Sequence, residues 1–295
     1  AVAVISAGNS MIENDGVTKV EVTGNATALQ GVSLNAYNAK EDFNVLDNVT
    51  GYSTVLSTTA LHSSIPYSIY SHGSVQTNLD DANSVIVTSG VATVSEADAI
   101  QEIANYSGAD SDYNITDNAA ALISAGDEVL NVAGVDIVTA SDTSVNANIG
   151  GDLSGFTADI EFDVVDNAAG LIAEMGGADV AGHLTEANSI TVNDGATSAN
   201  DGAILASFTA DVEFDVSDTA ANIAAEVASG VAPNYGADSL EDANSVFVES
   251  GTPVTAAQAE SVQDLINYSG GDIDISDSAF NLISAGDHVL NVNGV

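Results

Sequence analysis

Rows of acidic side chains are the feature of this sequence that could do chemistry. In FTADVEFDVSD, Phe208 to Asp218, acidic residues occupy alternate positions, and KEDFNVLDN, DSDYNITDN, DIEFDVVDN and GDIDISDS follow the same pattern from Lys40, Asp110, Asp159 and Gly271. Alternate residues of a β-strand point to the same face, so each row puts several oxygen atoms on one side. Oxygen ligands select hard cations, and calcium suits flexible carboxylate-rich sites best.

Two positions of the aligned stretches carry oxygen-bearing side chains throughout. They read Asp42, Asp112, Glu161, Glu213, Asp272 and Asn44, Asn114, Asp163, Asp215, Asp274. The candidate calcium ligands are the eight from residue 112 onward: Asp112, Asn114, Glu161, Asp163, Glu213, Asp215, Asp272 and Asp274. In stacked parallel strands these positions would form columns, about 4.8 Å apart if like strands are adjacent and about twice that if two strand types alternate. A solvated acidic face without a specific site is the alternative reading.

A third position is an aspartate at the end of each row: Asp47, Asp117, Asp166, Asp218 and Asp277. Each precedes a helix-like run, so we expect its carboxylate to cap that helix by accepting backbone N–H bonds. The residues between the two acidic positions, Phe43, Tyr113, Phe162, Phe214 and Ile273, should face the core.

The elements that position these rows are repeated. A second motif reads DDANSVIVTSG from Asp80, TEANSITVNDG from Thr185 and EDANSVFVESG from Glu241, with a degenerate copy, GVDIVTASD, from Gly134. Each motif combines a short strand of period 2 with a following helix of period 3.6, in half-units of about 26 residues. We therefore expect an α/β fold: a right-handed strand-helix solenoid of repeated half-units with a parallel sheet.

Two windings fit the spacing. Either each half-unit is one coil of a single sheet, which we favour, or a pair of half-units makes one large coil with two sheets. Residues 1–295 form a single repeat array, in which 1–79 are divergent repeats with an inserted loop near 52–78, and 80–295 are regular. The opening residues, 1–17, align with 119–135, which suggests docking end to end or a longer parent chain.

Composition excludes several classes of protein. The chain has 43 acidic residues against 2 basic ones and a formal net charge of -41, so nucleic-acid binding and attraction to anionic membranes are disfavoured. No apolar run reaches the length of a membrane-spanning helix, so we expect no membrane insertion. Cysteine is absent, which removes thiolate metal sites and disulfides. Such a charge repels itself unless salt or divalent ions screen it, which favours an extracellular or halophilic setting.

Other sites have weak support. His62, His72, His183 and His288 lack zinc-ligand spacing, and DSDYNITD lacks the glycine and closing glutamate of an EF-hand loop. Five glycosylation sequons leave modification open. An enzyme that processes polysaccharides would mark one coil with paired carboxylates and aromatic platforms, whereas here acids recur in every coil and Trp is absent. We expect no enzyme and no catalytic residues.

FDVSDTAANIAAEV, Phe214 to Val227, followed by ANSVFVESGTPVTAAQAESVQDLI, Ala243 to Ile266, resembles the SDTAANI, SGTP and TAAQ repeats of very large secreted and surface proteins of bacteria. These include hemolysin-type calcium-binding, adhesin-like and surface-layer-like proteins, and the resemblance covers most of the chain after Asp80. It implies an extracellular structural or adhesive protein: a surface-layer component, filament subunit or adhesin stalk, stabilised by calcium. A glycan- or protein-binding solenoid module is the alternative.

Overall fold

The computed structural model describes residues 20–24, 41–54, 84–176, 184–208, 210–229, 240–292 and 295. The chain divides into two compact units: unit 1 contains residues 1–142 and 156–161, and unit 2 contains residues 143–155 and 162–295. Of the loop expected near 52–78, residues 52–54 are helical and 55–78 lie outside the described residues, as do 1–17.

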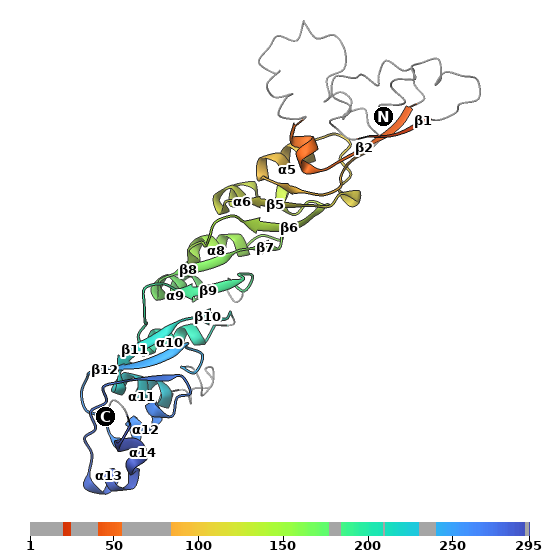
Figure 1. Ribbon diagram of the computed structural model, residues 1–295. Coiled ribbons are helices and arrows are strands. Elements are labelled where there is room, and N and C mark those ends of the chain that lie inside the picture. Colours follow the sequence, from red (N-terminus) through yellow and green to blue (C-terminus); the bar gives the residue numbers. More distant parts are fainter. Residues whose placement is uncertain are drawn as a thin grey trace, which may run out of the picture. The chain divides into compact units, whose positions relative to one another are not determined.

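Unit 1 is built from parallel strands with short helices between them (Figure 1). Its first sheet joins β1 (Val20–Gly24), β2 (Glu41–Asp47) and β3 (Ser84–Val87), and its second joins β4 (Val91–Ala92), β5 (Tyr113–Asp117), β6 (Val135–Ala140) and β7 (Ile160–Glu161). The helices are α5 (Val94–Gln101), the 3-10 turn η3 (Gly108–Asp110), α6 (Ala119–Ala125) and α7 (Asp127–Leu130).

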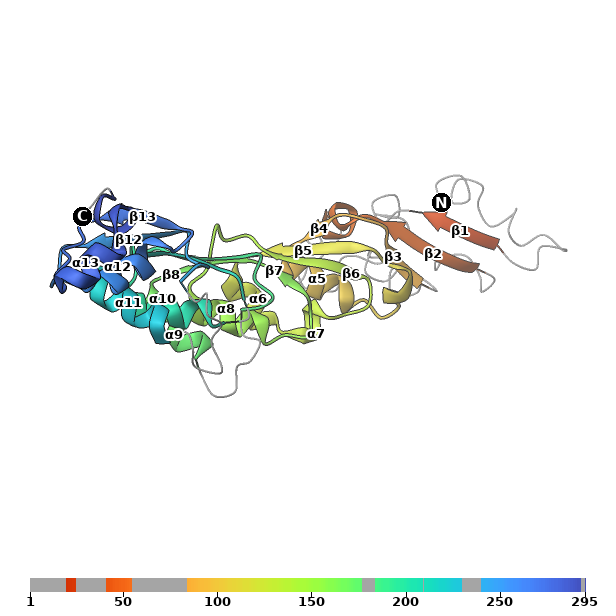
Figure 2. The ribbon, with the colours of Figure 1, turned by 90° about the horizontal axis from the view of Figure 1, so that it is seen from below.

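Unit 2 continues the alternation of strand and helix. One sheet has the order β8 (Asp163–Asp166), β9 (Ser189–Val192), β10 (Val212–Glu213), and the other β11 (Asp215–Thr219), β12 (Ser245–Glu249), β13 (Tyr268–Gly271). The helices are α8 (Ala147–Ser154), α9 (Ala168–Met175), α10 (Ala199–Ala206), α11 (Ala220–Ser229), α12 (Ala256–Gln263), α13 (Ala279–Ala285) and α14 (Asp287–Leu290). Helices α8 to α12 pack each on the next, along one side of the strands (Figure 2).

Strand pairing confirms the mixed α/β class and the parallel sheets. Val138 of β6 pairs with Ile115 of β5 and with Ile160 of β7, and in unit 2 Ile190 of β9 pairs with Val164 of β8 and Val212 of β10. Strands of consecutive half-units therefore pair directly, as the favoured winding predicts. They form four sheets where that winding predicts one, and in unit 2 the break falls at Phe214, between β10 and β11.

Seven of the described α-helices begin where a small polar residue caps them, whereas α7 and α14 follow a glycine that makes no side-chain cap. Thr93 and Thr255 form capping boxes with Glu96 and Gln258. In each box the threonine side chain accepts the backbone N–H of the third helical residue, and the side chain of that residue accepts the backbone N–H of the threonine. Single side-chain caps are made by Asn118, Asn146, Asn167, Ser198 and Ser278. These caps let helices of only two turns start at fixed positions after each strand.

The core combines large apolar residues from the acidic motifs with small residues from the helices. Tyr113, Phe162, Phe214 and Ile273 are all buried, which confirms that the position between the acidic residues faces inward. The side chain of Phe43 lies outside the described residues. Opposite Phe214, the helix contributes Gly202, where a Cβ atom would lie 2.7 Å from a methyl carbon of Val216. Glycine thus allows α10 to lie directly against its strand.

Candidate functional site

The strand-end aspartates bind backbone N–H groups from two different helix starts. The Oδ1 atom of Asp117 accepts a hydrogen bond from the N–H of Asn118 at 2.8 Å. Its Oδ2 atom accepts one from the N–H of Val94 at 3.1 Å. Val94 is the first residue of α5, in the preceding half-unit, so a single carboxylate joins two consecutive half-units.

The same arrangement recurs in unit 2. The Oδ2 atoms of three strand-end aspartates accept hydrogen bonds from the first residue of the preceding helix: Ala147 to Asp166 at 3.0 Å, Ala199 to Asp218 at 3.0 Å, and Ala256 to Asp277 at 3.1 Å. In each case Oδ1 accepts the N–H of the next residue. We call the bond from such an aspartate to the first residue of the preceding helix an inter-coil staple.

The other strand type makes staples as well. Asp142 follows β6 and accepts the N–H of Ala119, the first residue of α6. In unit 2, Asp194 follows β9 and accepts the N–H of Ala168, the first residue of α9, at 3.3 Å. The staples therefore join half-units of both kinds.

The structure corrects the expectation that the strand-end aspartates cap their own helices. The N-cap of α6 is Asn118, and that of α13 is Ser278, each one residue after the aspartate. The aspartate instead accepts the N–H of the N-cap residue and that of a neighbouring helix. A helix start carries several unpaired N–H groups and a positive partial charge, so two oxygen acceptors can serve it.

Hydrogen bonding holds the carboxylate of Asp277 in the charged form. The pKa of Asp277 lies below its usual value because the Asn281 amide, the Ser278 N–H and the Ala256 N–H all donate to the carboxylate. Such donors face the charged form and lose strength when it is protonated.

Three of the candidate calcium ligands on the strands lie beside a hydroxyl group of the neighbouring strand. Ser189 Oγ donates to Asp163 Oδ1 at 2.6 Å, and Ser245 Oγ donates to Asp215 Oδ1 at 2.6 Å. Thr139 Oγ1 lies 3.4 Å from Glu161 Oε2. Both serines belong to the ANS triplet of the second motif, whose recurrence is a signal in the sequence for donors beside the acidic rows.

Strand register shows that like positions do not stack as columns. Thr139 pairs with Glu161 on one side and with Thr116 on the other, so the residue level with Glu161 two strands away is Thr116, four residues after Asp112. In unit 2, Thr191 lies between Glu213 and Val165, and Val165 is four residues after Glu161. The expected stacking is therefore wrong for these pairs, because strands of the same motif, two strands apart in the sheet, are shifted by four residues in register.

The remaining candidate ligands are dispersed. Asp112 is exposed just before β5, and Asn114 Oδ1 accepts the N–H of Ile137 at 3.2 Å. Asp272 and Asp274 are exposed and lie between β13 and α13, outside any strand. Within the described ranges, no group of three or more His, Asp or Glu side chains is placed to hold a metal ion.

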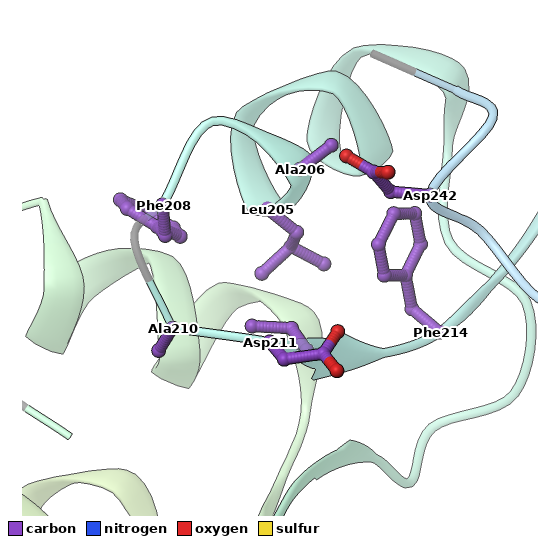
Figure 3. A pocket seen from close by; sticks show the side chains of 8 residues that line it. Leu205, Ala206, Phe208, Ala210, Asp211, Phe214 and Asp242 are labelled. Carbon is purple, nitrogen blue, oxygen red and sulfur yellow. The ribbon is translucent and has the colours of Figure 1, made fainter. Parts of the chain in front are cut away.

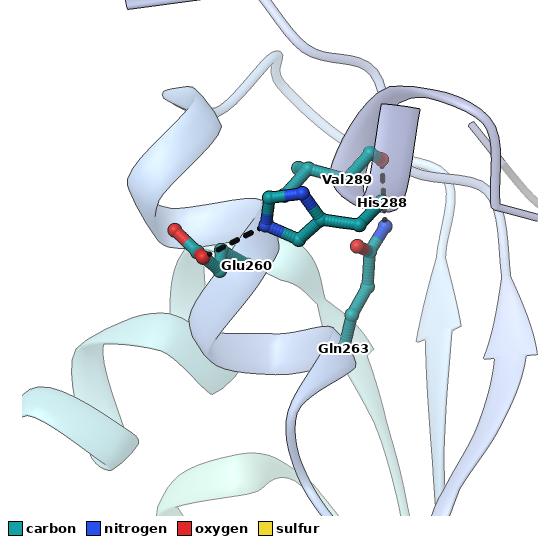
Figure 4. A network of polar contacts seen from close by, with 4 residues as sticks. All are labelled: Glu260, Gln263, His288 and Val289. Carbon is teal, nitrogen blue, oxygen red and sulfur yellow. Dashed lines mark hydrogen bonds and ion pairs between the residues drawn. The ribbon is translucent and has the colours of Figure 1, made fainter. Parts of the chain in front are cut away.

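In the part of the chain that is described, neither the contact of His288 with Glu260 nor a surface hollow forms a reactive centre. His288 Nε2 lies 3.1 Å from Glu260 Oε1 on the surface (Figure 4), and the other three histidines lie outside the described residues. A hollow of about 230 Å³ is lined by Leu205, Phe208 and Phe214, with Asp211 and Asp242 at its edge (Figure 3). A second hollow of about 310 Å³ is lined by Ser111, Asp112, Gly134, Val135 and Asp136. The two hollows thus lie below and at the lower end of the usual size range of small-molecule pockets.

No helix among the described residues has both the length and the apolar composition of a bilayer-spanning segment. Comparison of the chain with protein-family models and with curated proteins found no match.

Proposed function

We propose that the chain is an extracellular structural repeat protein, a right-handed strand-helix solenoid that serves in a bacterial surface layer, filament or adhesin stalk. The observation that supports this most is the recurrence of the inter-coil staples at Asp117, Asp166, Asp218 and Asp277. Each of these strand-end aspartates uses a carboxylate oxygen to join its half-unit to the preceding one.

This use of carboxylates suits a scaffold. An enzyme sets one group of titratable residues apart by its surroundings, whereas here the same bond is repeated in successive half-units. In a repeat protein, stability is the sum of the half-units and of the interfaces between neighbours, so a bond repeated at each interface strengthens the whole array.

Calcium remains part of the proposal as a stabilising counter-ion. The support for it is the formal net charge of -41, which must be screened in any compact state. The Asp163 and Asp215 carboxylates each already accept a serine hydroxyl, so a cation bound there would share these oxygens with that donor.

The proposed role is tested on native material. Electron microscopy of the producing cells, with antibody raised against residues 84–176, should label a filament, lattice or stalk on the outside. Protease added to intact cells should release the labelled protein. Labelling confined to the cell interior, with no loss on protease treatment, contradicts the proposal.

A further inference from the structure

The tetrapeptide Asn-Asp-Gly-Ala occurs twice in unit 2, at 193–196 and at 200–203. An aspartate followed by glycine is prone to a spontaneous rearrangement of the main chain, because glycine has no side chain that shields its backbone nitrogen. The two copies are identical in sequence but differ in local structure, so the fold decides which of them can react.

The rearrangement converts aspartate to isoaspartate. The backbone nitrogen of the glycine attacks the Cγ atom of the protonated aspartate side chain, a C–N bond forms, and the N–H proton and the side-chain hydroxyl leave as water. The product is a five-membered succinimide ring. Water then adds to the main-chain carbonyl carbon of the aspartate and breaks its bond to the glycine nitrogen. One water leaves and one is taken up, so the mass is unchanged and no other reactant is needed.

The first copy lies in an exposed bend after β9. Asp194 and Gly195 are both exposed, and Gly195 has a φ of 90°, in the left-handed region that glycine adopts readily. A Cβ atom at Gly195 would meet no other atom within 4 Å, so the space around this backbone is open. Among the described residues, no acceptor is found for the Gly195 N–H. Neither packing nor a main-chain hydrogen bond therefore blocks attack on the Asp194 side chain.

The second copy lies inside helix α10, which protects it. Gly202 is buried, and its N–H donates to the carbonyl of Ser198 at 2.9 Å. The Asp201 N–H donates to Ser198 Oγ at 3.1 Å, so the capped first turn fixes this residue in the helical conformation. In an α-helix the N–H groups point along the axis while the side chains point away from it. The Gly202 nitrogen therefore cannot reach the Asp201 Cγ atom.

An inter-coil staple restrains the reactive copy. Asp194 Oδ1 accepts the N–H of Ala168 at 3.3 Å, whereas the other five staples measure 2.6 to 3.1 Å. The carboxylate must leave this donor before it can turn toward Gly195, so the staple has to open before the ring can close. The bond at Asp194 is the longest staple among the described residues, and a long hydrogen bond is a weak one.

We propose that Asp194 and Gly195 form a site of spontaneous isoaspartate formation, and that modification there removes the inter-coil staple to Ala168. In isoaspartate the carboxylate is attached directly to Cα and the main chain is longer by one methylene, so the acceptor no longer lies where aspartate held it. The array thus loses one join between half-units as the protein ages. The site uses water alone as its reactant and does not depend on the proposed function.

The test compares the two copies within one protein. The folded 295-residue chain and the same chain in concentrated urea are incubated, sampled over weeks and digested, and isoaspartate is located by electron-transfer fragmentation of the peptides. In the folded chain we expect it at residue 194 and not at residue 201, whereas in urea both positions should react at equal rates. Asp194→Glu keeps a carboxylate but cannot close the five-membered ring, so position 194 should then stay unmodified.

Hydrogen exchange at Ala168 tests the loss of the staple. Molecules with isoaspartate at position 194 should exchange the Ala168 amide about fivefold faster, as expected for the loss of one hydrogen bond. Ala168→Pro removes the donor at the first helical position, where proline is well accepted and the extended backbone of Asn167 suits it. This variant should form isoaspartate at residue 194 about fivefold faster than the wild type.

Two results would overturn the site itself. One is that residue 201 reacts as fast as residue 194 in the folded chain, and the other is that residue 194 remains aspartate while both positions react in urea. Unchanged exchange at Ala168 in the modified molecules would overturn the loss of the staple. The cell-surface labelling experiment is independent of all three results, so the proposed function stands or falls separately.

Discussion

The carboxylate of Asp166 accepts a hydrogen bond at 3.0 Å from the backbone N–H of Ala147, nineteen residues earlier in the chain. Asp166 ends strand β8 and Ala147 begins helix α8, so the bond joins elements of consecutive half-units. Because the donor is a main-chain group, any residue except proline at position 147 could supply it. Only the acceptor position demands a particular side chain.

Replacing this acceptor should destabilise unit 2. Asp166→Ala removes the acceptor of the backbone N–H groups of Ala147 and Asn167 and of the Asn167 side-chain amide. We expect the free energy of unfolding to fall by about 1 to 2 kcal/mol. Urea denaturation followed by circular dichroism measures the change. Asp211→Ala is the control, since it removes a negative charge from the same unit at an exposed position; equal effects of the two substitutions would show that the staple contributes nothing.

The staple at Asp277 should weaken in acid. Its folded-state pKa is depressed below the usual value of 3.8, so its contribution is present above the unfolded pKa and is lost as pH falls through the folded pKa. Amide hydrogen exchange at Ala256 should therefore speed up below about pH 4. In Asp277→Asn the exchange rate, corrected for intrinsic pH dependence, should vary less. Identical profiles in the two proteins contradict the assignment.

Cation dependence separates bound calcium from general screening. If calcium stabilises the acidic face, EGTA should lower the melting temperature at low salt, and calcium should restore it at concentrations where sodium chloride does not. A response to sodium chloride alone would indicate screening of the net charge. A melting temperature that neither EGTA nor salt changes would contradict both forms of the idea.

Close packing of helix on strand should make Gly202 intolerant of a larger side chain. A Cβ atom there would lie 2.7 Å from Val216 and 3.2 Å from the ring of Phe214, so Gly202→Ala should cost about 1 to 3 kcal/mol despite the better helix propensity of alanine. Chemical denaturation measures it. Gly155→Ala, whose nearest contact is 3.3 Å to the carbonyl oxygen of Asp152, should change stability far less.

Much of the fold could be predicted from local pattern. Period-2 rows placed Phe162 and Phe214 in the core, and the two alternating motifs predicted parallel strands separated by helices. These features depend on residues close in sequence, so a repeated pattern reveals them.

The partners of the acidic residues could not be predicted in the same way. The separation between a stapled helix start and its aspartate is 23 residues for Val94 and Asp117 but 19 for Ala199 and Asp218, because the connecting turns differ in length. No fixed spacing therefore marks the bond. The pairing of Glu213 with Thr191 likewise depends on the register shift between neighbouring strands. An alignment of like motifs does not reveal that shift.

The alternation of hydroxyl-bearing and acidic strands restricts how such a chain can change length in evolution. In unit 1, β6 with Thr139 lies between β5 and β7, and in unit 2, β9 with Ser189 and Thr191 lies between β8 and β10. Loss or duplication of a single half-unit would bring two acidic strands, or two hydroxyl-bearing strands, into direct contact. Duplication of a pair keeps every donor beside an acceptor. Natural variants should therefore differ in length by whole pairs of half-units, which span 49, 52 and 59 residues between the like positions Asp112, Glu161, Glu213 and Asp272. Gene duplications that are out of phase with this pair should be eliminated by selection.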